Sequence, residues 1–155
     1  MHMSKLLKTL KLVWASPVTL VGLVYAASFG AIGWYKYIGV KEGALVWLLD
    51  RTKAPTFLMK YWKNRAGHAC GNVVVLRNPI DQNPRTFKHE LKHVDQVERL
   101  GVFQPIVYAA SYLAIKFGCP GSSPYYSNPF EVDARRYAGQ IIDIEGIDKK
   151  LHGDK

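Results

Sequence analysis

The chain has 155 residues, of which 48% are hydrophobic and 21% are charged, a length that fits one compact domain without a second catalytic module of ordinary size. Its 21 Lys and Arg residues outnumber 12 Asp and Glu residues, yet the +9 chain is too apolar and aromatic to be a disordered basic tail. Residues 1–65 hold 10 basic and 2 acidic side chains, whereas residues 66–155 hold 11 and 10. This asymmetry predicts that the N-terminal part contacts a membrane or a nucleic acid.

An uncharged apolar segment decides between these two partners. Residues 12–35 contain no charge, and 17 of these 24 residues are apolar, which is long enough to cross a bilayer. Lysines flank the segment, and aromatic residues that favour the membrane interface lie near its ends, at Trp14, Trp34, Tyr35 and Tyr37. Because no nucleic-acid motif accompanies these features, we expect residues 5–41 to contact membrane lipid and expect no nucleic acid as a partner.

The form of this segment stays open at the level of sequence. Pro17 and the recurring glycines at Gly22, Gly30 and Gly33 allow a kinked or re-entrant hairpin as well as a single span. A signal peptide with small residues at Ala26-Ala27-Ser28, or a pair of apolar helices buried in a soluble protein, are the alternatives. A hairpin would place both basic flanks in the cytoplasm.

Cysteine usage bears on the compartment. The chain has two cysteines, Cys70 and Cys119, without a CxxC pair or a regular framework. This favours a reducing compartment, although a single bridge between the two is the alternative. We therefore expect a membrane-associated protein whose catalytic part lies in the cytoplasm.

The remaining elements are predicted from turn signals, in chain order. Residues 42–66 are basic and broken by Pro55, which is typical of a linker or of a face on lipid headgroups. A β-branched run at 72–77 predicts a strand, and Asn83-Pro84 and Gly101 predict the start and stop of a helix. A stretch over 105–117 whose only charge is Lys116 predicts a core helix, and Asn128-Pro129 begins a third helix that is expected to end near Ile144.

The helix predicted from Pro84 carries an HExxH motif, His89-Glu-Leu-Lys-His93. Residues at i and i+4 lie on one helical face, so both imidazoles can reach one Zn²⁺. Glu90, beside them, can act as a general base toward a water molecule that zinc activates. The alternative is a helix with two ordinary histidines.

A catalytic zinc usually has a third protein ligand, and Glu131 is the candidate. It lies in the first turn of a helix capped by Asn128, where the helix dipole favours a carboxylate. The alternative role for Glu131 is a plain pair with Arg135 at i+4. Asp95 and His68 are weaker candidates for the third ligand.

Taken together, these motifs give the chain a resemblance to zincin metallopeptidases of the gluzincin type, in which a glutamate on a later helix completes HExxH. The chain also resembles a poorly characterised set of bacterial and phage HExxH proteins over most of its length. The matching stretches are Pro17-Val-Thr-Leu-Val-Gly-Leu23, Gly71-Asn-Val-Val-Val-Leu76, His89-Glu-Leu-Lys-His-Val-Asp-Gln96, Leu100-Gly-Val-Phe-Gln-Pro105 and Tyr125-Tyr-Ser-Asn-Pro-Phe-Glu-Val-Asp-Ala-Arg135.

The resemblance implies zinc held by His89, His93 and Glu131, with Glu90 activating water. It also implies that the strand near 72–76 is the edge that binds an extended peptide, through Asn72, Val73, Val74 and Val75. Beside this implied site, Gln96 lies one turn beyond His93 and can orient it. Candidates for an oxyanion donor are the phenols of Tyr125, Tyr126 and Tyr137.

These observations predict an α+β, mainly helical fold: a zincin-like domain with a short sheet, preceded by a membrane segment or hairpin. We expect a membrane part over residues 1–41, a linker over 42–66, a metallopeptidase domain over 67–146 and a polar tail over 147–155. The expected function is hydrolysis of a peptide or protein substrate by zinc-activated water. The alternative is a non-catalytic interaction or structural protein that retains a zinc site.

Overall fold

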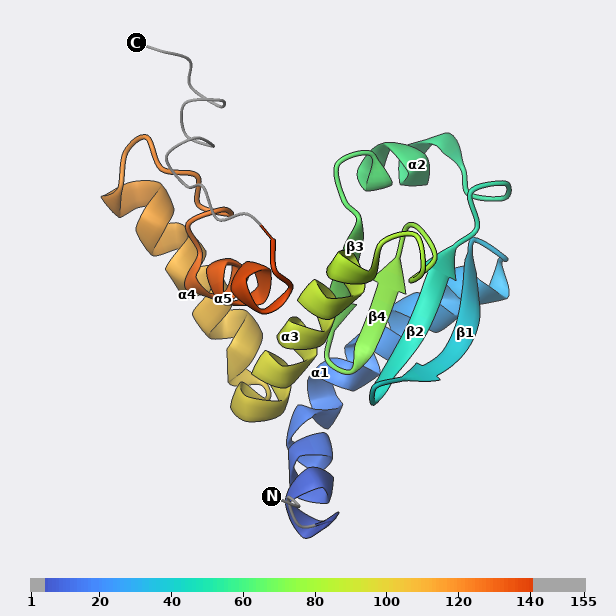
Figure 1. The fold of residues 1–155 in the computed structure, drawn as a ribbon, viewed down its shortest axis with the longest axis horizontal. Helices are drawn as coiled ribbons and strands as arrows, with labels where there is room; N and C mark the ends of the chain where they lie inside the picture. Colours follow the sequence, from blue (N-terminus) through green and yellow to red (C-terminus); the bar gives the residue numbers. More distant parts are fainter. Residues whose placement is uncertain (1–4, 141–155) are drawn as a thin grey trace.

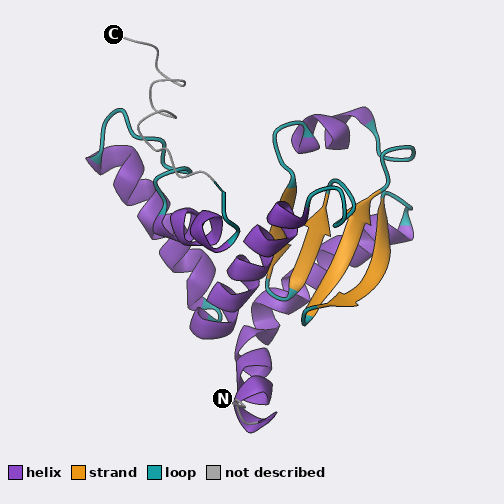
Figure 2. Cartoon of the chain, viewed as in Figure 1, coloured by secondary structure: helices purple, strands orange, loops and turns teal. Residues whose placement is uncertain are grey.

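The computed structural model describes residues 5–140, which form an α+β fold around a small mixed sheet (Figures 1 and 2). Within this range there are five helices and four strands. In chain order they are α1 Lys5–Ala31, β1 Tyr35–Lys41, β2 Ala44–Leu49, α2 Thr56–Trp62, β3 Gly67–Cys70, β4 Val73–Leu76, α3 Pro84–Leu100, α4 Phe103–Gly118 and α5 Pro129–Tyr137. The predicted tail at 147–155, and the predicted end of the last helix near Ile144, lie outside the described residues.

The sheet has the strand order β1-β2-β4-β3. β1 pairs with β2 and β3 pairs with β4 in antiparallel fashion, whereas β2 and β4 are parallel. β4 therefore lies inside the sheet, and all four of its residues are buried. The prediction that the 72–76 strand is an edge of the sheet is wrong, because β4 pairs with β2 on one side and with β3 on the other; the outer strands are β1 and β3.

Two hydrophobic clusters cover the two faces of the sheet. Val73 and Val75 point to the side of α1 and α2, whereas Val74 and Leu76 point to the side of α3. This alternation follows from the two-residue period of a strand. Burial on both faces explains why the sequence of β4 is an uninterrupted apolar run. Figure 1 shows α3 in front of the sheet and α1 behind it.

The segment predicted as a span or hairpin is a single helix, so the hairpin is excluded for these residues. By length and composition, Leu7–Ala31 is long and apolar enough to cross a membrane. Pro17 lies inside α1, and Figure 1 shows the helix bending between its projecting first turns and the part behind the sheet. A proline inside a helix removes one backbone hydrogen bond, which accounts for such a bend.

The predicted boundaries at residues 41 and 66 do not separate structural units. β2 and α2 form within the expected linker, and Leu49, Leu58 and Trp62 are buried in the cluster that α1 covers. The linker prediction therefore fails, because Pro55 marks the start of a short helix rather than a flexible connection. Residues of α1, the sheet and α2 share one core.

The helices that carry the motif residues begin as predicted. The Asn83 side chain accepts a hydrogen bond from the Thr86 amide at the start of α3, and Asn128 accepts one from Phe130 at the start of α5. Gly101, with φ 56°, ends α3. α4 differs from the prediction of a core helix, because none of its residues is buried.

Candidate metal centre

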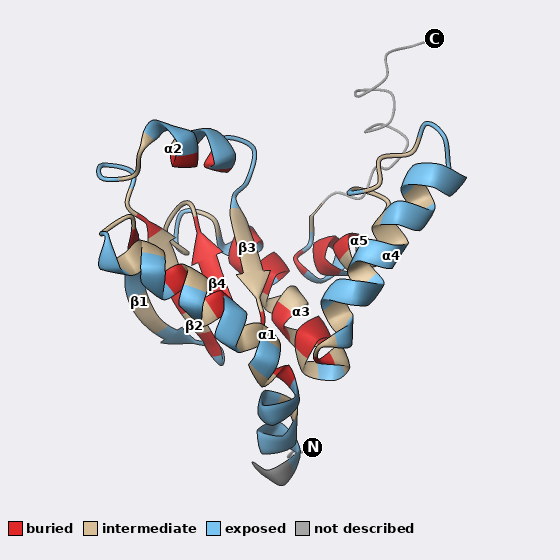
Figure 3. Ribbon diagram, turned by 180° about the vertical axis from the view of Figure 1, so that it is seen from behind, coloured by how far each residue is buried: buried red, intermediate tan, exposed pale blue. Residues whose placement is uncertain are grey.

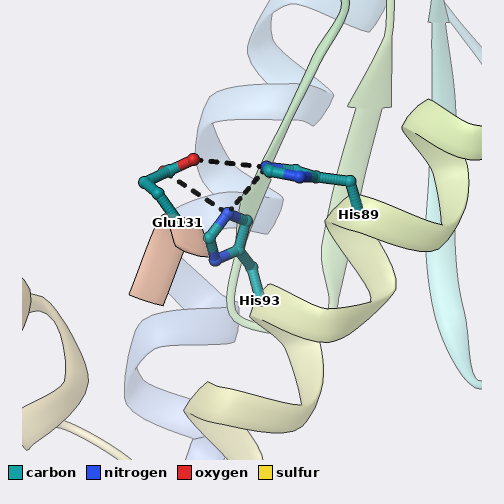
Figure 4. A group of neighbouring side chains, drawn as sticks. All are labelled: His89, His93 and Glu131. Carbon is teal, nitrogen blue, oxygen red and sulfur yellow. Dashed lines mark hydrogen bonds and ion pairs between the residues drawn. The ribbon is translucent and has the colours of Figure 1, made fainter. Parts of the chain in front are cut away.

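Helix α3 places the two motif histidines on one face, with their rings converging (Figure 4). The Nε2 atoms of His89 and His93 lie 3.1 Å apart. His89 is buried and His93 is half-buried. The i,i+4 spacing therefore produces the convergence that the sequence predicts.

Glu131, on the first turn of α5, approaches the same point from the opposite side (Figure 4). Its Oε2 lies 3.4 Å from His89 Nε2, and its Oε1 lies 3.4 Å from His93 Nε2. These two distances join different oxygens of Glu131; with one ligand atom from each of the three residues, the atoms lie within 4.8 Å of one another, which lets them hold one metal ion. Across residues 5–140, these three form the one cluster of His, Cys, Asp or Glu side chains that could hold a metal ion.

The outward-facing nitrogens of both rings are hydrogen-bonded to side-chain amides. His93 Nδ1 donates to Gln96 Oε1 at 2.8 Å, and His89 Nδ1 donates to Gln140 Oε1 at 3.1 Å. Because an amide oxygen only accepts, each Nδ1 carries the proton and each Nε2 presents its lone pair to the cluster. Such contacts orient metal-binding imidazoles and fix their tautomer.

Gln96 has the orienting place that its position on α3 predicts. Its Nε2 also donates to the Phe130 carbonyl, which ties α3 to the start of α5. Gln140 was not predicted from the sequence, because it follows α5 outside any motif and only the fold brings it to His89.

Two further side chains hold the Glu131 carboxylate. Tyr108, on α4, donates to Oε1 at 3.0 Å, and Arg135 donates to Oε2 at 3.4 Å. Glu131 therefore pairs with Arg135 at i+4 and at the same time points to His89 and His93. Tyr108 was missed because it lies in an apolar stretch that carries no motif.

The electrostatics of the cluster indicate that it attracts a cation. Burial alone would raise the pKa of Glu131, but hydrogen bonds and charges from His89 and His93 hold it well below its usual range. Burial alone would lower the pKa of His93, but the Glu131 carboxylate outweighs this and raises it. Two imidazole lone pairs and a carboxylate thus converge on a point where positive charge is stabilised.

Glu90 lies beside the cluster without belonging to it. Its side chain is buried, and burial raises its pKa to about 7. The side chain packs against Gly67 at the start of β3, where an added Cβ would lie 2.9 Å from Glu90 Oε1. A carboxyl group that titrates near neutral pH is suited to general acid and base catalysis. This contact of Gly67, like Gln140 and Tyr108, was not predicted from the sequence.

All four motif side chains line a cleft of about 860 Å³. Its walls come mainly from β3, α3, the start of α4 and the loop before α5, with Val18 of α1 and Glu131 and Arg135 of α5 also lining it. Tyr125 and Tyr126 line the cleft, whereas Tyr137 lies outside it, with its ring 5.7 Å from Lys92 Nζ. The sequence predicted that residues 72–75 lie beside the cluster. In the structure the strand beside the cluster is β3, not β4.

The weaker ligand candidates have other partners. Asp95 pairs with Lys92 and Arg99. His68 lines the cleft but stacks on Trp62, with ring centroids 5.0 Å apart. Cys70 and Cys119 are both free, so the alternative of a bridge between them is not realised.

No protein-family model, curated protein or solved structure matches this chain.

Proposed function

We propose that the protein is a membrane-associated zinc metallopeptidase of zincin, gluzincin-like type, which hydrolyses peptide bonds with a zinc-activated water. The observation that carries this proposal is the His89, His93 and Glu131 cluster, whose ligand atoms lie within 4.8 Å of one another, close enough to hold one metal ion. Two imidazoles and one carboxylate are also a known ligand set of catalytic zinc. Zinc bound there would supply a Lewis acid for attack on a carbonyl.

The residues around the cluster can perform the proton transfers. Glu90 is within the same cleft, and its raised pKa lets it accept a proton from water and return it to a leaving amine. Tyr125 and Tyr126 are the candidates for donating a hydrogen bond to the developing oxyanion. The free edge of β3, at Gly67–Cys70, offers backbone groups that an extended substrate peptide can pair with.

The alternative is a non-catalytic protein that keeps zinc for structural reasons. A structural site usually has four protein ligands. Within residues 5–140 the cluster has three, and they border a cleft beside a buried carboxylate. These features favour the enzyme.

Membrane association forms part of the proposal and is supported by α1, with its apolar composition and its lysines at Lys8 and Lys11. The free thiols of Cys70 and Cys119 support a cytoplasmic catalytic part.

The proposal is tested by incubating the zinc-loaded full chain with a peptide library and identifying products by mass spectrometry. Glu90→Gln should retain one zinc per chain but cleave about 10²–10⁴-fold more slowly, because the proton acceptor is lost. Glu98→Gln, on the same helix, is the matched control: Glu98 Oε1 accepts from Asn72 Nδ2, and an amide oxygen can still do so. Equal cleavage by Glu90→Gln and wild type, or no cleavage by the zinc-loaded wild type, would overturn the proposal.

A further inference from the structure

Helix α1 has two different faces. Its fully buried residues are small, Ala15, Gly22 and Ala26, and beside them Leu23, Tyr25 and Phe29 pack partly buried against the core. Large apolar side chains point outward, and Val21 and Val24 are 64% and 68% exposed. A helix in a soluble protein normally turns its large apolar side chains inward. The outer face of α1 is therefore suited to an apolar environment.

The inner face of α1 is bound too closely to the domain for lipid to surround the helix. An added Cβ at Gly22 would overlap the carbonyl oxygen of Cys70 in β3, and one at Gly30 would contact the ring of Trp47. Thr19 also accepts a hydrogen bond from the Asn72 amide in the turn between β3 and β4. Only one side of this part of α1 is thus available to lipid.

Helix α4 offers a second apolar surface. Ile106 is 63% exposed, Leu113 50% and Phe117 75%. The inner side of α4 binds the site, since Tyr108 donates to Glu131 and the Tyr108 carbonyl accepts from Asn128. Inward contacts therefore account for the position of α4, while these outward apolar side chains are half or more exposed.

The two surfaces belong to one side of the molecule. The rings of Trp14 in α1 and Phe103 in α4 are in contact, with centroids 6.0 Å apart. Seen from behind, α1 and α4 both lie on the near side, and much of each is exposed (Figure 3). The cleft lies between them, because Val18 of α1 and Pro105 of α4 both line it.

The charges on these helices favour an anionic bilayer as the partner of the two apolar faces. Neither α1 nor α4 contains an acidic residue. Among the lysines whose burial the structure describes, Lys8 and Lys116 are exposed and Lys11 is half-buried. A second copy docked on the same face would bring these lysines together without acidic partners on either helix. Anionic headgroups would pair with them while the apolar side chains enter the acyl region.

We propose that the outward faces of α1 and α4 together lie in one leaflet of an anionic membrane. α1 then lies along the bilayer rather than across it, and the cleft opens at the level of the headgroups. This orientation also names a substrate class, and that consequence rests on the proposed function: the substrate is a polypeptide segment held at the membrane surface.

The depth of each helix tests this orientation. Single cysteines replace Val24, Ile106 or Phe117 in the full chain, with Cys70→Ala and Cys119→Ser as background, and carry an environment-sensitive fluorophore. The protein is bound to phosphatidylcholine and phosphatidylglycerol vesicles that contain lipid nitroxides at shallow or deep acyl positions. Lys88→Cys, exposed on α3, is the matched control. We expect shallow quenching at all three sites and none at position 88.

Three results would overturn the proposal. Deep quenching on α1 without quenching on α4 would make α1 a span. If the α4 probes are shielded from water without vesicles and the protein is a dimer, the outward face is a contact between copies. Absence of quenching at all three positions would exclude the membrane. None of these outcomes depends on catalysis, so failure here is distinct from failure of the zinc peptidase proposal.

A charge variant measures the contribution of α4 alone. Ile106→Asp with Phe117→Asp should weaken vesicle binding about 10-fold or more per site, because each lost apolar insertion reduces the binding free energy. Val40→Asp, 61% exposed on β1, should leave binding unchanged. A library peptide that wild type cleaves is then offered in a soluble form and in a lipid-anchored form. The α4 variant should cleave the anchored form more slowly than wild type does and the soluble form at the wild-type rate. Unchanged vesicle binding, or equal loss on both peptide forms, would contradict the proposed role of α4.

Discussion

Gln96 provides the sharpest test of how the metal centre is organised. Its buried side chain accepts from His93 Nδ1 at 2.8 Å and donates to the Phe130 carbonyl at 3.0 Å. Gln96→Leu removes both bonds, so His93 loses its fixed orientation. We expect the zinc affinity to fall about 10–100-fold, which is about 1.4–2.7 kcal/mol. The free energy of unfolding of the metal-free protein should fall by about 1–3 kcal/mol, because buried polar groups lose their partners.

Two further variants separate orientation from stability. Gln96→Glu keeps an acceptor for His93 but loses the donor and places a carboxylate beside Asp133, which Gln96 Nε2 contacts at 3.1 Å. It should retain more zinc affinity than Gln96→Leu while still losing stability. The control is Gln82→Leu, in an exposed loop, with changes within about 0.5 kcal/mol. Competition with a chromogenic chelator measures affinity, and urea unfolding measures stability. Wild-type zinc affinity in Gln96→Leu would refute the orienting role.

Three other variants test the cleft and the packing beside it. Burial lowers the pKa of His68 from 6.5 to about 4, so between these pH values the unfolded chain binds a proton that the folded chain does not. As the pH falls from 6.5 to 4, the free energy of unfolding of wild type should therefore fall by up to about 3 kcal/mol relative to that of His68→Phe. Parallel stability curves of the two proteins in urea unfolding would refute this. Gly67→Ala should lower kcat with zinc retained, because the added methyl displaces Glu90; an unchanged kcat would argue against that contact. Gly22→Ala should cost about 1–3 kcal/mol in urea unfolding, whereas Gly118→Ala, with no atom within 4 Å, should stay within about 0.5 kcal/mol, and equal losses would dispute the close packing of α1.

The local parts of the fold could be predicted from the sequence because short-range rules govern them. Asn83 and Asn128 cap the helices that they were expected to cap, and the spacing of His89 and His93 was enough to predict a shared face. Such features depend on a few neighbouring residues.

The features that were mispredicted depend on contacts between distant segments. Strand order cannot be read from the apolar run at Val73–Leu76, because a strand buried on both faces looks the same at an edge or in the centre. The exposure of α4 was also hidden, since apolar composition is shared by core helices and membrane-facing helices. Tyr108 and Gln140 reach the site only through the placement of whole elements.

We propose that His89, His93 and Glu131 hold one zinc ion with a position left open. X-ray absorption at the zinc edge of the zinc-loaded full chain measures these ligands. We expect one zinc per chain, with two imidazole nitrogens and carboxylate or water oxygens at about 2.0–2.1 Å. Sulfur at about 2.3 Å, a third imidazole in place of an open position, or failure to bind zinc would contradict it.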